Sequence, residues 1–314
     1  MKSSPILLLH YGDAFYMESI IRSSVALGNE VFLLGDKENA YLGAIDGCTH
    51  LPFSEFVSPQ NQSDFDASFQ FVHGDDFVGQ ENWVKFNFLK MIAIYNFSKK
   101  MGCDRFWLLD SDVLVTRNLS NLIGAFEEID LMTHPRNLSP QGLVNEPEVF
   151  KDFFYYVITK FQDQTFLESA KLDFKKNPDY GLTYMRFWNA FYKEREYSIQ
   201  EMGDFSSEFH FVPCLFNQPH YQKYPFRFQN FNMTEVYFGN ERSIWVKSEK
   251  GQWVNPVTIN LSWLPPHIHY RIVNHATGVK RSLFVLEKWI TRNDKVRMHL
   301  AQSLPDRLLL KFRK

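Results

Sequence analysis

Three short, uninterrupted apolar runs constrain the fold of this chain more than any other feature of its sequence. The runs cover 6–9, 31–34 and 106–109, and polar residues interrupt none of them. A strand that is buried on both faces has this pattern, and such strands belong mainly to parallel sheets. Helix-like stretches at 15–27 and 83–100 lie between the runs. Strand and helix therefore alternate, which predicts an α/β fold with a mostly parallel sheet flanked by helices.

The stretch at 83–100 is the clearest predicted helix. It places Phe86, Leu89, Ala93 and Phe97 at helical spacing, and Gly102 follows its end, where glycine commonly terminates a helix.

The second half of the chain is less regular than the first. Residues 146–200 are predicted to be largely helical, whereas 207–262 alternate aromatic and polar residues among turn formers, which indicates antiparallel strands and loops. No repeat or flexible linker divides the chain. We therefore expect one domain with an elaborated C-terminal half over 1–291, followed by a basic segment at 292–314.

Composition narrows the possible functions. The 314 residues are 45% hydrophobic and 17% aromatic, enough to form a large core, so overall disorder is excluded. The net charge of −2 gives no sign of a nucleic-acid partner. Three widely separated cysteines with no CxxC spacing fit a reducing compartment better than a disulfide framework.

Both ends of the sequence bear on localisation. The apolar run at 6–9 is too short for a signal sequence or a membrane span, so we expect a cytoplasmic protein. The segment at 292–314 mixes leucines with Lys and Arg, a pattern typical of peripheral contact with an anionic membrane surface. The alternative is that these leucines pack on the domain while the charges stay solvated.

Two aspartates follow the third apolar run directly, in the order Asp110-Ser111-Asp112. Ligands of open α/β sheets bind beyond the carboxyl ends of the strands. If the chain stays extended there, the two carboxylates point the same way and Ser111 points aside. Carboxylate oxygens suit Mn²⁺ or Mg²⁺, and such an ion can neutralise a diphosphate. A solvated turn is the alternative.

This region resembles the metal-binding core of GT-A glycosyltransferases, in which a basic helix and an apolar strand precede a DxD motif and a short apolar strand follows it. The chain has Lys90 on the helix, the run at 106–109, the two aspartates, and then Val113-Leu114-Val115. The resemblance implies the GT-A (Rossmann-like) fold. It also implies transfer of a sugar from a nucleotide-sugar donor, with UDP the expected nucleotide, to a glycan or other hydroxyl acceptor.

A second motif lies about 160 residues further on. His275-Ala-Thr-Gly278-Val-Lys280 is similar to the HxxGxxK motif of retaining enzymes of the glycogenin and lipopolysaccharide galactosyltransferase type, with the lysine one residue earlier. The resemblance implies that His275 is the third metal ligand beside Asp110 and Asp112. It further implies that Gly278 and Lys280 meet the diphosphate, and that the anomeric configuration is retained.

Other residues are candidates for the nucleotide-sugar site. Lys90 shares the apolar stripe of its helix, so it either faces an anionic partner or is a solvated helix lysine. Asp36 is a candidate to accept hydrogen bonds from a base or ribose, or is a turn residue. Tyr11 is a candidate to border the base. Ser111 is a further candidate to contact the nucleotide sugar. His267 and His269 are alternative metal ligands.

Asp204 is the candidate catalytic carboxylate, together with Lys90 as a second catalytic candidate. The Asp204 carboxylate could deprotonate an acceptor hydroxyl in an inverting enzyme or stabilise an oxocarbenium-like centre in a retaining one. An acidic loop before a strand is the alternative.

Three other functions are compatible with parts of the sequence. A haloacid-dehalogenase-type phosphatase also has DxD after a buried strand, but Val113-Leu114 stand where a Gly-Thr pair is expected. A nucleotidyltransferase would show a Gly-rich basic loop after the first strand, and His10-Tyr11-Gly12-Asp13 is not one. A catalytically inactive nucleotide-sugar-binding protein stays open.

Overall fold

The computed structural model describes residues 4–134, 139–203, 209–212, 215, 223–228, 231–234, 236–247, 252–262, 264 and 266–277. The predicted site residues Asp204, Gly278 and Lys280 lie outside the described residues, as does the basic segment at 292–314.

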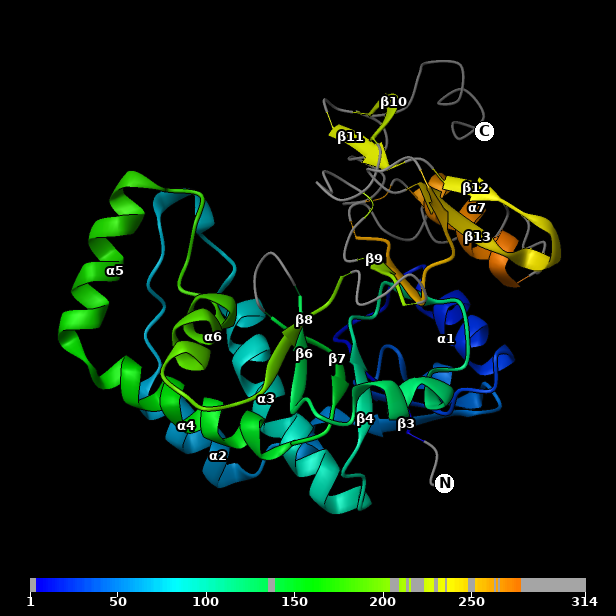
Figure 1. Ribbon diagram of the computed structural model, residues 1–314. Coiled ribbons are helices and arrows are strands. Elements are labelled where there is room, and N and C mark those ends of the chain that lie inside the picture. The colour runs from blue at the N-terminus through cyan, green and yellow to red at the C-terminus, as the bar shows by residue number, and fades with distance from the viewer. Residues whose placement is uncertain are drawn as a thin grey trace, which may run out of the picture.

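A seven-stranded sheet in the order β3-β2-β1-β4-β7-β6-β8 forms the centre of the protein (Figure 1). Strand β7 runs antiparallel to both of its neighbours, and every other adjacent pair is parallel. The predicted mostly parallel α/β sheet is thus confirmed. The strands are β1 (Ile6–Leu9), β2 (Val31–Gly35), β3 (Cys48–Pro52), β4 (Phe106–Leu109), β6 (Leu131–Thr133), β7 (Pro140–Val144) and β8 (Ile199–Glu201).

Helices cover both faces of this sheet, as a parallel sheet requires. One face carries a phenylalanine-rich core beneath α2 (Pro59–Ser68), α3 (Glu81–Met101), α4 (Glu148–Gln162), α5 (Gln164–Lys176) and α6 (Tyr184–Lys193), with α5 at the outer edge (Figure 1). The other face packs on α1 (Met17–Ala26) and the 3-10 helix η4 (Leu119–Phe126). Shorter 3-10 helices are η1 (Ala40–Ala44), η2 (Phe53–Phe56), η3 (Asp75–Phe77) and η5 (Asn240–Arg242).

Helix α3 shows how local sequence sets an element. The helix extends the predicted 83–100 by two residues at its start and one at its end. Phe88 and Phe97 are buried in the core that α3 shares with α4 and α6. Gly102 ends the helix with φ of 60°, a left-handed conformation that glycine adopts without steric cost.

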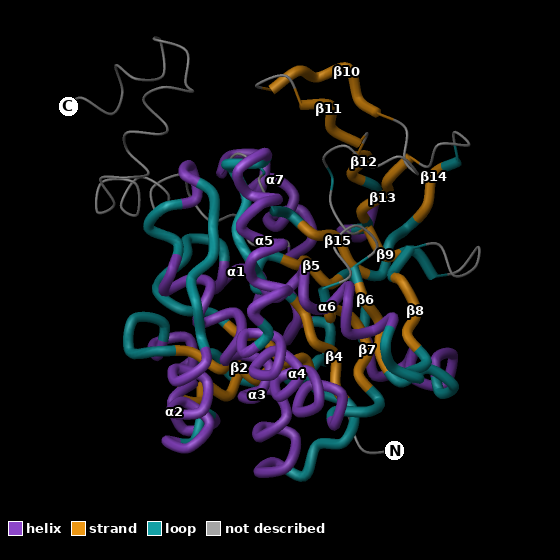
Figure 2. Tube along the Cα trace, turned by 90° about the vertical axis from the view of Figure 1, so that its left-hand side faces the viewer, coloured by secondary structure: helices purple, strands orange, loops and turns teal. Residues whose placement is uncertain are grey.

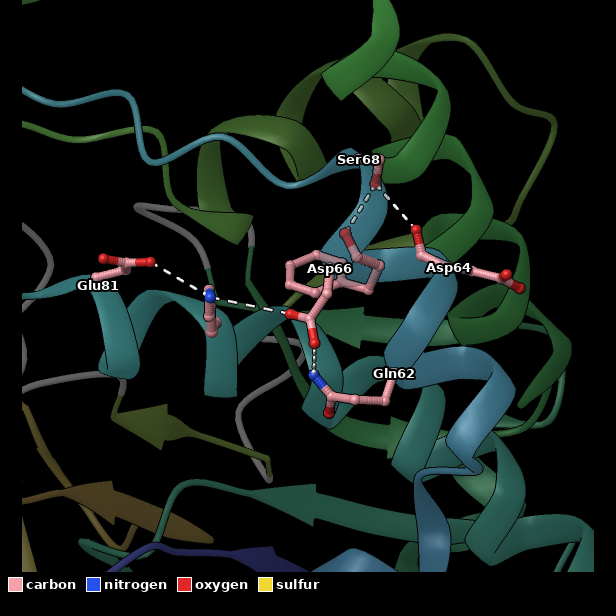
Figure 3. A network of polar contacts seen from close by, with 7 residues as sticks. Gln62, Asp64, Asp66, Ser68 and Glu81 are labelled. Carbon is pink, nitrogen blue, oxygen red and sulfur yellow. Dashed lines mark hydrogen bonds and ion pairs between the residues drawn. The ribbon is translucent and has the colours of Figure 1, made fainter.

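The surface between α2 and α3 carries a polar network (Figure 3). Lys85 Nζ lies 3.3 Å from Glu81 Oε1 and 3.9 Å from Asp66 Oδ1, so this side chain links the two helices at the surface. Ser68 Oγ donates to the backbone carbonyls of Phe65 and Asp64. These contacts lie on α2 and the first turns of α3.

The C-terminal half adds small sheets beside the carboxyl edge of the central sheet (Figure 2). Strand β15 (Thr258–Asn260) lies between β5 (Val113–Val115) and β9 (Phe211–Val212). Strand β15 pairs in parallel with β9 and antiparallel with β5, which lies outside 207–262. The predicted antiparallel strands over 207–262 are confirmed in the other small sheets. Those strands are β10 (Lys223–Phe228), β11 (Phe231–Thr234), β12 (Val236–Phe238), β13 (Ile244–Lys247) and β14 (Trp253–Val254).

Helix α7 (Pro266–Thr277) packs against α1 and so joins the C-terminal elements to the central domain. None of the helices in the described part of the chain is long and apolar enough to cross a membrane.

Candidate active site

The order of the strands in the central sheet reverses beside β1. The chain runs from β1 to β2 and β3 on one side, and then returns to β4 on the other side of β1. Where strand order reverses in an open α/β sheet, a crevice opens beyond the carboxyl ends of the strands. His10 directly follows β1, and Asp110 directly follows β4. These two residues therefore border the expected ligand crevice.

The two aspartates occupy a turn rather than an extended segment. The backbone amide of Val113 donates to the carbonyl of Asp110 at 3.0 Å, which closes a four-residue turn between β4 and β5. The chain does not stay extended after β4, because β5 leaves the central sheet to pair with β15. The turn leaves Asp110 exposed, buries Ser111 and half-buries Asp112.

Ser111 points into the protein and is held there by two aromatic side chains. Its hydroxyl lies 2.8 Å from His10 Nδ1, and the Tyr16 side chain lies close enough to interact with it. Burial lowers the pKa of His10, although the charges of Asp36 and Asp13 act in the opposite direction. The imidazole is therefore neutral at pH 7. These contacts anchor the middle of the turn to β1 and α1.

Asp112 is held from the other side by the segment that follows β15. Ser262 Oγ donates to Asp112 Oδ2 at 2.6 Å, and the backbone amide of Leu261 donates to the Asp112 carbonyl at 3.0 Å. The second carboxylate oxygen, Oδ1, is buried and has no hydrogen-bond partner. Burial, together with the negative charge of Asp110, raises the pKa of Asp112 to about 6.

This arrangement fits a divalent cation. An ionised carboxylate that is buried with an unpaired oxygen is costly unless a positive charge compensates for it. The carboxylates of Asp110 and Asp112 are hard oxygen ligands, the type that Mn²⁺ and Mg²⁺ prefer. The same negative potential acts on Tyr16, because burial and the charge of Asp112 raise its pKa to about 12. The turn thus concentrates negative charge where a cation would relieve it.

Asp36 lies at the neighbouring strand end and shapes the loop after β1. Its Oδ2 accepts from the backbone amide of Gly12 at 2.7 Å, and its Oδ1 accepts from the amides of Glu38 and Asn39. Gly12 has φ of 86°, which glycine adopts most easily. The fully buried Asn39 donates to the carbonyls of Gly12 and His10. Asp36 is therefore a structural staple of this loop.

Tyr11 and Lys90 occupy different surroundings. Tyr11 is 71% exposed at the end of β1, and its ring centroid lies 5.9 Å from that of Phe86. Such exposure leaves the ring available to a flat ligand. Lys90 is half-buried on α3, with its ammonium 4.3 Å from the ring centroid of Tyr184. This cation–π contact is the partner that the structure shows for Lys90.

The structure does not gather His275 with the two aspartates into a metal site. Among the described residues, no three His, Cys, Asp or Glu side chains are placed to hold a metal ion. His275 lies near the end of α7, where Nε2 is 3.0 Å from the Ser243 carbonyl and the ring packs on Phe238. The role of His275 as a third ligand therefore stays a prediction of the motif.

His269 contacts aromatic residues at the start of α1. Its ring stacks on Tyr16 with centroids 5.2 Å apart and meets Phe15 edge-on at 5.4 Å. Burial lowers the pKa of His269 to about 4, so the ring is neutral, and its Nε2 has no hydrogen-bond partner. The ring therefore packs as an apolar group between α1 and α7.

Three residues of this site escaped the sequence interpretation: His10, Tyr16 and Ser262. His10 had a usable signal, because it is the first polar residue after a buried strand. Tyr16 and Ser262 had none, since their contacts with the turn depend on how α1 and the segment after β15 pack against it.

Solved structures that resemble the chain in fold include mouse xyloside xylosyltransferase 1 in its apo form (10% identity, TM-score 0.43, 66% of this chain and 86% of that chain). An active-site mutant of LgtC matches with 12% identity, a TM-score of 0.40, and coverage of 88% and 97%. The PaToxG glycosyltransferase matches with 12% identity, a TM-score of 0.33, and coverage of 61% and 69%. No protein-family model matches the sequence, and no curated protein does.

Proposed function

We propose that this protein is a metal-dependent glycosyltransferase of the GT-A type that uses a nucleotide-sugar donor. One observation carries the proposal. A buried, unpaired oxygen of Asp112 lies next to the negative charge of Asp110, at the strand-order reversal where α/β proteins bind ligands. A nucleoside diphosphate bound through a divalent cation is the ligand that suits this charge and position.

Each residue of the site has a separate role in this proposal. Asp110 and Asp112 hold Mn²⁺ or Mg²⁺, which when bound neutralises charge on the diphosphate leaving group. Tyr11 borders the base with its exposed ring, and Asp36 holds the loop that carries this ring. Lys90 contributes positive charge from α3. Gly278, Lys280 and the catalytic carboxylate Asp204 complete the proposed set on the basis of the motif resemblance.

The finer chemistry also follows from the motif. UDP is the proposed nucleotide, the acceptor is a glycan or another hydroxyl compound, and the configuration at the transferred carbon is retained. NMR of the first product formed tests the last point. An inverted anomer would contradict retention and would assign Asp204 the role of a general base.

A thermal-shift screen of nucleotide sugars, with and without Mn²⁺, tests the function directly. A ligand that binds only the folded state raises the melting temperature. We expect a rise with a UDP-sugar only when Mn²⁺ is present, and no such rise in Asp112→Asn. A panel without any Mn²⁺-dependent shift would contradict the proposal. A shift without release of UDP from the donor, alone or with acceptors, would instead indicate an inactive nucleotide-sugar-binding protein.

A further inference from the structure

Ser262 is fixed to Asp112 by a set of contacts that span most of the chain. The two residues are 150 positions apart, yet their side chains lie 2.6 Å from each other. Strand β15 brings them together, because Asn260 pairs with Val113, the residue after Asp112. The Asn260 side chain then accepts from the Ser262 backbone amide at 2.7 Å, which sets the turn that carries the hydroxyl.

These contacts determine which oxygen of Asp112 is unpaired. The Leu261 amide fixes the backbone of Asp112, and the Ser262 hydroxyl fixes Oδ2. Rotation of the carboxylate would break a charge-assisted hydrogen bond, which is among the stronger hydrogen bonds in proteins. Oδ1 is consequently the oxygen left without a partner.

We propose that Ser262 is a positioning residue for the divalent cation: its hydroxyl orients Asp112 so that Oδ1 faces the ion. This inference rests on the proposed function, since it assigns a role toward the metal that Asp110 and Asp112 hold. Ser262 acts through Asp112 and needs no contact with the substrate. Hydrogen-bond partners of metal ligands commonly change metal affinity by 10–100-fold when they are removed.

A purely structural role makes a different prediction. If Ser262 only satisfied a buried oxygen, its removal would lower stability and leave the affinity for the cation unchanged. Cation affinity, measured without turnover, therefore separates the two roles.

The experiment is a Mn²⁺ titration of the full chain, with and without UDP, in which electron paramagnetic resonance measures the free ion. We expect Ser262→Ala to weaken Mn²⁺ binding about tenfold. Ser262→Thr, which retains the hydroxyl, is expected to bind within about twofold of the wild type, as an outer-shell donor would be preserved. Ser68→Ala removes a serine hydroxyl bond on α2, away from the site, and serves as the matched control (Figure 3).

Ser262→Val keeps the decision clear if the alanine variant folds poorly. Valine has the shape of threonine without its hydroxyl, so the ratio of the two affinities isolates the hydrogen bond. Equal Mn²⁺ affinities in Ser262→Ala and the wild type, or in Ser262→Val and Ser262→Thr, would overturn the inference while leaving the proposed function intact. Failure of the wild type to bind Mn²⁺ under either condition would overturn both.

Discussion

Asp36 Oδ2 accepts a hydrogen bond from the backbone amide of Gly12 at 2.7 Å, joining the ends of β2 and β1. The other oxygen accepts from Glu38 and Asn39, so three backbone amides converge on one carboxylate. The loop that carries Tyr11 therefore has a defined shape before any ligand binds.

Replacing Asp36 tests this staple. We expect Asp36→Ala to lower the free energy of unfolding by about 1–3 kcal/mol, because partly buried amides lose a charged acceptor. We also expect the nucleotide-sugar donor to bind more weakly, because the loop that carries Tyr11 loses its shape. Urea denaturation measures the first effect and a nucleotide-sugar titration the second. Unchanged stability would show that solvent satisfies these amides equally well.

Asp112→Asn is expected to separate activity from stability. Transfer is lost because the charge that holds the cation is gone, whereas the metal-free protein becomes more stable, because no buried carboxylate has to ionise at neutral pH. A gain of about 1 kcal/mol in the free energy of unfolding would raise the melting temperature by about 2 °C at pH 7.5 without metal. Asp66→Asn, at the surface of α2, is the control and should retain activity (Figure 3). A lower melting temperature in Asp112→Asn would contradict the prediction.

The stability of the metal-free protein should depend on pH through Asp112. Its pKa rises from 3.8 to about 6 on folding, so the unfolded chain releases this proton at lower pH. The contribution favours folding below about pH 4 and is lost as the pH rises to about 6. Subtracting the pH profile of Asp112→Asn from that of the wild type isolates it. Mn²⁺ should reduce the loss, since it stabilises the ionised form, and a difference that does not vary between pH 4 and 7 would refute this account.

Lys90 and Lys85 form a matched pair on α3. Lys90 lies over Tyr184 and is a proposed donor contact, whereas Lys85 forms ion pairs with Glu81 and Asp66 at the surface. We expect Lys90→Met to reduce kcat/KM at least about tenfold, which corresponds to a loss of about 1.4 kcal/mol in transition-state stabilisation. Lys85→Met should leave it unchanged, with at most about 1 kcal/mol lost in stability. Equal kinetics in the two variants would remove Lys90 from the site.

A metal titration decides the role of His275. If His275 is the third metal ligand, His275→Ala should weaken Mn²⁺ affinity at least about tenfold, because removing a group of the metal site has an effect of this size. Unchanged affinity together with a lower melting temperature would leave His275 as the contact between α7 and Ser243 that the structure shows.

Local sequence was sufficient for the central elements. Strands β1 and β4 coincide with the apolar runs at 6–9 and 106–109, and α3 ends at the glycine that the sequence indicates. A strand that is buried on both faces needs an uninterrupted apolar run, and a helix of 21 residues gives its side chains a helical period. Both patterns can therefore be recognised in the local sequence. The position of Asp110 after β4 follows from the apolar run that precedes it.

Local sequence therefore specifies the alternation of strands and helices and the pair of aspartates at a strand end. The turn at Asp110–Asp112, the contact of His10 with Ser111 and the pairing of Ser262 with Asp112 arise only when distant segments pack together. The difference lies in the range of the interactions. Backbone propensity and periodicity act over a few residues, whereas the orientation of a buried carboxylate depends on donors that β15 brings to it from 150 residues away.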